Sequence, residues 1–184
     1  MNITKFQLPS IICNHHQTFP ILEMVAHAVL FHRTTGIPVI PKEVESCLFD
    51  DLVYTIIDDE PIQKKVKEEL NHITDSEKKS VLPIVISLYD SVKKYGILGE
   101  YYEKLEFERW KVDLHYVIQH SFADEDNMMN QLRAVLDAIM NVHELPGHRP
   151  NYDKFSFSIK DASAQKDGSF YDMFKGIPRM FGTP

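Results

Sequence analysis

The stretch between residues 18 and 36, TFPILEMVAHAVLFHRTTG, limits what this chain can fold into more than any other. Within it, every residue of the range 21–31 is apolar except Glu23 and His27. A helix that is apolar on almost all sides is stable only where the rest of a domain surrounds it. Thr18 has a side chain suited to the N-cap position. The sequence therefore predicts one central, buried helix around which the other elements pack.

Length, charge and cysteine content narrow the class of protein. A chain of 184 residues can bury a full core, and we predict one domain at 1–163 followed by a tail at 164–184. The net charge of −7 argues against nucleic acid as a partner, because binding to phosphates requires a basic surface. Two cysteines cannot form a disulfide framework, which favours a reducing, cytoplasmic location. No apolar run approaches the ~20 residues of a transmembrane segment.

The order of the other elements predicts an α/β (α+β) domain. We expect the central helix to be the one internal helix of this domain. Alternation of apolar and polar residues indicates strands, and apolar residues three or four apart indicate helices. The expected elements are an edge strand at 4–12, a hairpin within 37–57, an amphipathic helix starting at 58–61 with Ile62, Val66, Leu70 and Ile73 on its buried side, strands at 81–90 and 105–118, a helix at 125–144, and a last strand at 155–159.

The strand at 105–118 carries two apolar sets of opposite parity. Leu105 and Phe107 form the first set, and a longer set begins at Trp110. A β-bulge reverses which face a side chain occupies, so a bulge near Glu108 and Arg109 would bring both sets to one face. We therefore predict a bulge there.

The helix at 125–144 has an outer face that is unusually small and poor in charge. A solvated helix normally carries more lysine and glutamate, whereas the centres of protein interfaces are depleted of charge. The face is either a docking surface or an ordinary exposed surface, and the sequence favours neither. Its residues are Asn130, Arg133, Ala134, Asp137, Ala138, Met140 and Asn141.

The search for catalytic or metal-binding residues finds no convincing site. His143 and His148 resemble a zinc-protease pair, but they are five residues apart and Pro146 and Gly147 interrupt the helix between them. His27 is expected to be a hydrogen-bonded histidine of the core. There is no nucleophile elbow and no glycine-rich phosphate loop. We expect no enzymatic activity, no metal and no cofactor, and a function that depends on contact with other proteins.

Several segments resemble one known family. The sequence is similar to the autophagy-related protein 101 family, whose members are HORMA-domain proteins. The similarity covers nearly the whole chain, and its most specific part is the helix end HRTTG. The segments that carry it are LEMVAHAVLFHRTTG at 22–36, EFERWKVDLHYV at 106–117, MNVHELP at 140–146 and FSFSIKDAS at 155–163.

The resemblance implies a fold and a function. The fold would be a HORMA-like domain with three helices on an antiparallel sheet, and the protein would have no enzymatic activity. Its partner would be the HORMA domain of autophagy-related protein 13, in a heterodimer within the Atg1/ULK-type kinase complex that starts autophagosome formation. Such a protein would act in the cytoplasm and at the preautophagosomal structure. The helix at 125–144 would correspond to the helix that HORMA domains use to dimerise.

The chain departs from the family at one recruitment motif. Family members often carry an exposed Trp-Pro-Phe finger between two strands, which we expect here to end near Lys94 and to begin near Leu105. This chain has the tetrapeptide YGIL at the matching place. The candidates for a substitute finger are therefore Tyr95, Ile97 and Leu98.

A second hypothesis rests on the aromatic C-terminal tail. A membrane-trafficking module could dock on vesicles through its large apolar side chains, but the negative net charge argues against binding to anionic membranes. The residues concerned are Phe170, Phe174, Ile177 and Phe181.

Overall fold

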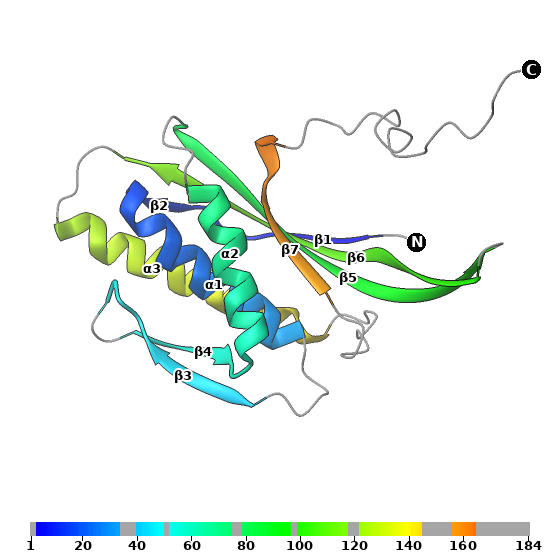
Figure 1. Cartoon of the computed structure of the whole chain (residues 1–184). Helices are drawn as coiled ribbons and strands as arrows, with labels where there is room; N and C mark the ends of the chain where they lie inside the picture. Colours follow the sequence, from blue (N-terminus) through cyan, green and yellow to red (C-terminus); the bar gives the residue numbers. More distant parts are fainter. Residues whose placement is uncertain are drawn as a thin grey trace, which may run out of the picture.

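The computed structural model describes residues 3–33, 40–49, 52–74, 79–96, 99–117, 122–144 and 156–164. These residues form a mixed α/β structure with a sheet and three helices, consistent with the expected HORMA-like α+β fold (Figure 1). The helices are α1 (Thr18–Arg33), α2 (Glu60–Thr74) and α3 (Phe122–Met140). The strands are β1 (Thr4–Gln7), β2 (Ile11–Cys13), β3 (Pro41–Glu45), β4 (Val53–Ile57), β5 (Val81–Gly96), β6 (Gly99–Tyr116) and β7 (Ser156–Asp161).

The main sheet has the order β1-β6-β5-β7, and β2 also pairs with β6. The expected antiparallel pairing holds for β5 with β6 and for β5 with β7. The single edge strand predicted at 4–12 is instead two short strands, and both run parallel to β6. Pro9 lies between them, because proline has no N–H to donate to a ladder.

The predicted β-bulge is present in β6. Leu88 of β5 pairs with Glu108, while the next residue, Tyr89, pairs with Glu106. The register of the ladder therefore skips Phe107, which is the extra residue of the bulge. The extra residue allows Phe107, Glu108 and the alternating residues that follow to be buried on one side of the sheet.

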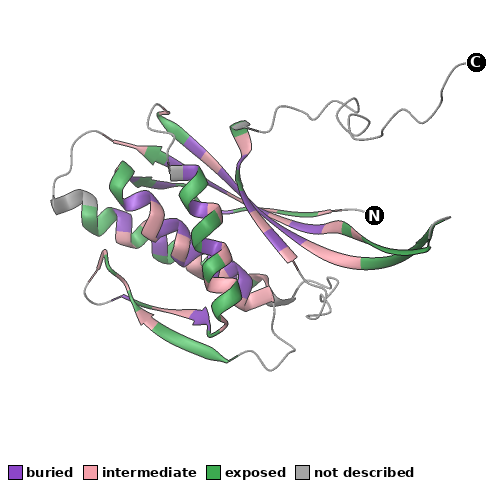
Figure 2. Cartoon of the chain, in the orientation of Figure 1, coloured by how far each residue is buried: buried purple, intermediate pink, exposed green. Residues whose placement is uncertain are grey.

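The central helix is buried as predicted. Helix α1 packs against α2, α3 and β4, and most of its surface is covered (Figure 2). The N-cap prediction is wrong, because a 3-10 turn at His15–Gln17 precedes the helix and Thr18 already has helical dihedral angles. The N–H of Asn14 instead donates to Oε1 of Gln17 at 2.9 Å, and the Thr18 hydroxyl donates to the Tyr116 oxygen at 3.1 Å.

Helix α2 and the second sheet also follow the sequence pattern. Val66, Leu70 and Ile73 of α2 are buried, and Ile62 is partly buried. Strands β3 and β4 form the predicted antiparallel hairpin within 37–57. Among the residues that the structure describes, no helix combines the length and apolar character that crossing a bilayer demands.

One row of large side chains joins the strands of the main sheet to the helices. The row crosses β1, β6, β5 and β7 in register and consists, in that order, of Phe6, Trp110, Ile86 and Ile159. The rings of Phe6 and Trp110 stack with their centroids 4.2 Å apart. Because side chains alternate along a strand, this row lies on the face that the helices cover, and it fixes the sheet against the core.

Candidate functional site

The inner face of α3 holds this helix against the domain. This face packs toward α1 and β2. Its buried residues are three or four positions apart, as on one side of a helix: Met128, Leu132, Val135 and Ile139. The expected helix at 125–144 corresponds to α3 followed by a 3-10 turn at Asn141–Glu144. One side of this region is therefore anchored in the core, and the opposite side is available for contact.

The predicted docking face lies on that opposite side. Six of its seven residues are exposed, and Ala138 is partly buried. The face carries only two charges, those of Arg133 and Asp137. The exposed side of α2 contrasts with it, because Lys64, Lys67 and Glu68 crowd that surface. The low charge of the face reduces the cost of removing it from water.

A hollow of about 350 Å³ continues the face at the C-terminal end of α3. Met140 and Val53 are both exposed, and α1 and β4 supply most of the wall. Sequence reasoning missed the residues from α1 and β4, because only the folded chain brings them beside α3. The hollow is lined by Ala28, Phe31, His32, Val53, Tyr54, Thr55, Leu136 and Met140.

The finger candidates lie at the end of a long hairpin. The expectation that the strands end near Lys94 and begin near Leu105 is wrong, because the β5–β6 ladder continues to the pair Gly96 and Gly99. Cross-strand ion pairs accompany this extension, and one of them joins Lys93 to Glu100 at 2.5 Å.

Aromatic side chains gather on this arm. Tyr95 is 76% exposed, and Tyr101 and Tyr102 are also exposed. Sequence reasoning identified only Tyr95 of these three. Ile97 and Leu98 lie outside the described residues, as do the tail candidates Phe170, Phe174, Ile177 and Phe181.

A buried charge cluster connects two of the segments noted in the sequence. Arg33, in the last turn of α1, donates from Nε to Oε1 of Glu108 at 2.8 Å and pairs with the other carboxylate oxygen through Nη2. The indole N–H of Trp110 also donates to Oε1 of Glu108, at 2.5 Å. The segment that ends in HRTTG and the segment EFERW therefore meet at one carboxylate. This contact ties the end of the central helix to the β-bulge.

The histidines do not form a metal site among the described residues, where no group of three or more suitable ligands occurs. His27 is buried as expected, but its Nδ1 has no hydrogen-bond partner among the described residues. It faces a hollow of about 320 Å³ that Glu23, Cys47, Tyr54 and Lys67 also line. Burial, together with the charge of Lys67, lowers the pKa of His27 to about 4.

Comparison with known proteins identifies the family. The family model described as "Autophagy-related protein 101" matches residues 10–152. The match includes α1, α2, α3 and the cluster formed by Arg33, Glu108 and Trp110. No curated protein matches the chain. Because the matched residues make up more than half of the sequence, the chain belongs to the autophagy-related protein 101 family, and its role is autophagy-related.

Proposed function

We propose that this chain is a non-catalytic adaptor subunit that binds and stabilises the HORMA domain of autophagy-related protein 13. In this proposal the heterodimer is part of the Atg1/ULK-type kinase complex and promotes autophagosome formation. The adaptor acts in the cytoplasm and at the preautophagosomal structure. Membership in the autophagy-related protein 101 family supports the proposal.

The observation that carries the proposal is the outer face of α3. Asn130, Ala134 and Asn141 are exposed, and none of them carries a charge that association would have to desolvate. Small side chains allow a partner helix to approach closely. A helix that is fixed by its buried face presents this surface with its backbone already ordered, which reduces the conformational entropy lost on binding.

The neighbouring hollow adds an anchor point to this face. Aromatic and aliphatic side chains that fill pockets supply much of the energy of protein interfaces. Phe31 and Leu136 form part of the wall, and Val53 and Met140 stand beside them. In the proposed heterodimer, an apolar side chain of the partner occupies this hollow while the partner helix lies along α3.

The test introduces one carboxylate into the proposed interface. Ala134→Glu would bury an unpaired charge at the centre of the face, which costs several kcal/mol and lowers affinity by more than about a hundredfold. The matched control is Lys64→Glu, which places a carboxylate on the exposed side of α2. Light scattering on a sizing column and titration calorimetry with the HORMA region of autophagy-related protein 13 measure the result.

We expect the wild-type chain and Lys64→Glu to form a one-to-one complex, and Ala134→Glu to remain alone with an unchanged circular dichroism spectrum. Binding of Ala134→Glu with wild-type affinity would show that α3 is not the docking surface. Separate elution of the wild-type chain and its proposed partner at micromolar concentration would reject the adaptor proposal itself.

A further inference from the structure

Strand β7 forms one edge of the main sheet. It pairs with β5 on one side, and no described strand pairs with its other side. An open edge presents unpaired N–H and C=O groups, which can pair with a strand of another molecule. The sequence of β7 favours such pairing, because SFSI alternates apolar residues with small uncharged ones. This chain therefore needs a means of protecting the edge.

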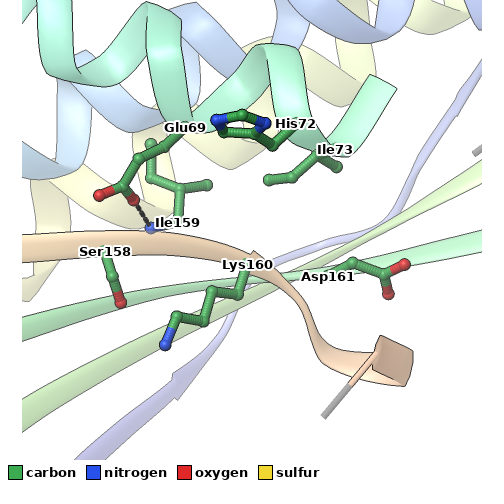
Figure 3. A pocket seen from close by; sticks show the side chains of 7 residues that line it. All are labelled: Glu69, His72, Ile73, Ser158, Ile159, Lys160 and Asp161. Carbon is green, nitrogen blue, oxygen red and sulfur yellow. Dashed lines mark hydrogen bonds between the residues drawn. The ribbon is translucent and has the colours of Figure 1, made fainter. Parts of the chain in front are cut away.

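Two side chains of α2 occupy the outer edge of β7. The carboxylate of Glu69 accepts a hydrogen bond from the backbone N–H of Ile159 (Figure 3). The ammonium group of Lys65 donates to the backbone C=O of Phe157 at 2.5 Å. The two strand residues are two positions apart, so their outward backbone groups lie on the same edge. A donor and an acceptor from α2 thus replace the groups that a neighbouring strand would supply.

The geometry of a helix and a strand explains why this pair fits. The four residues from Lys65 to Glu69 advance about 6 Å along the helix, and two strand residues span about 6.6 Å. The remaining difference is within reach of two long side chains.

Further contacts hold the pair in place. The Lys65 ammonium lies 4.2 Å from the centre of the Phe157 ring and 3.8 Å from the Glu69 carboxylate. The Lys65 side chain is 36% exposed, and its partial burial lowers the pKa of Lys65 from its usual value.

The opposite edge of the sheet is protected in a similar way. The backbone N–H of Ile12 in β2 donates to Oε1 of Gln131, which comes from α3, at 2.7 Å. Pro9 interrupts that edge between β1 and β2. Helix side chains therefore contact the outer strands on both sides of the sheet.

We propose that Lys65 and Glu69 act as a substitute strand that keeps β7 closed to strand addition by a second copy of this chain. The second copy is the expected occupant because the first four residues of β7, SFSI at 156–159, alternate apolar and uncharged polar side chains and are complementary to themselves in antiparallel pairing. A hollow of about 350 Å³ beside the edge, lined in part by Ile73 and Ile159, gives an added strand room to enter (Figure 3). The proposal does not depend on how α3 binds a partner.

The test removes both side chains and measures self-association. Lys65→Ala combined with Glu69→Ala opens the edge, and Lys64→Ala combined with Glu68→Ala is the control. The control deletes the same residue types at the same spacing, but its pair lies on the exposed side of α2. Sedimentation velocity from micromolar to near-millimolar concentration measures assembly, and hydrogen exchange reports on the Ile159 amide.

We expect Lys65→Ala combined with Glu69→Ala, the edge variant, to self-associate at least about tenfold more tightly than the control. At low concentration, the amide hydrogen of Ile159 should exchange with solvent faster in the edge variant than in the control. A folded edge variant that sediments like the control, with unchanged exchange at Ile159, would overturn the proposal. If the double variant does not fold, Glu69→Ala alone decides in the same way, because it still frees the Ile159 N–H. Glu69→Gln retains an acceptor and is expected to behave like the control.

Discussion

Replacing Arg33 with methionine is expected to reduce the free energy of unfolding by about 3–5 kcal/mol. The Glu108 side chain is only 2% exposed, and that of Arg33 is 13% exposed. Methionine keeps much of the apolar volume of arginine but leaves a buried carboxylate with the Trp110 indole as its remaining donor in this cluster. A domain of this size is stable by about 5–15 kcal/mol, so the loss is a large share of the total.

The expected loss of stability comes from leaving the Glu108 carboxylate buried without its cation. A second substitution separates this effect of charge from the effect of lost side-chain packing. Glu108→Gln in the Arg33→Met background removes the charge and keeps an oxygen that can accept from the indole. It should restore about half of the lost stability. Arg109→Met is the control, because its ion pair with Glu106 is more exposed and should contribute about 1 kcal/mol or less.

Urea unfolding followed by tryptophan fluorescence is a suitable assay, because the chain has a single tryptophan and it lies in this cluster. Equal slopes of unfolding free energy against urea concentration would show that the unfolded states are comparable. A loss of less than about 1 kcal/mol for Arg33→Met, or no recovery on adding Glu108→Gln, would show that Arg33 does not neutralise a costly buried charge.

Two further predictions concern single titratable groups. The pKa of His27 is lowered to about 4, below its value of about 6.5 in an unfolded chain. The neutral, buried His27 therefore contributes its full stabilisation above about pH 6.5. This stabilisation, up to about 3 kcal/mol, is lost as the pH falls toward 4. Urea midpoints measured between neutral pH and about pH 4.5 should fall more for wild type than for His27→Leu, and parallel curves would contradict this. Burial raises the pKa of the Cys13 thiol to about 12, whereas Cys47 is exposed. A thiol reagent should therefore label Cys47 alone in the native protein, which mass spectrometry can check, and rapid native labelling of Cys13 would disprove its burial.

Much of the fold could be predicted from local patterns of apolar and polar residues, because each of these patterns depends only on residues that are close in the sequence. The apolar residues around His27 indicated a buried helix, and the change of parity after Phe107 indicated the bulge in β6. The outer face of α3 could be identified from residue spacing, since Ala134 and Asp137 face away from Leu132. These features repeat with the period of a helix or a strand, and tertiary contacts did not change them.

Other features could not be found this way. The parallel pairing of β1 and β2 with β6 brings together residues about a hundred positions apart, and no local signal encodes it. The hollow beside Met140 needs walls from three elements. The missing partner of His27 Nδ1 is a property of its surroundings, so the sequence could show that the residue is buried but not what it contacts.

Residue identity and spacing along the chain were enough to predict the family, the buried central helix, the β3–β4 hairpin and the two faces of α3. The contacts between groups far apart in the sequence had to be seen in the folded chain: Arg33 with Glu108, and Lys65 and Glu69 with the outer edge of β7. The physical reason is that buried charges and strand edges must find specific partners, and several arrangements of the same elements could supply them. Packing of the helices on the sheet selects one arrangement.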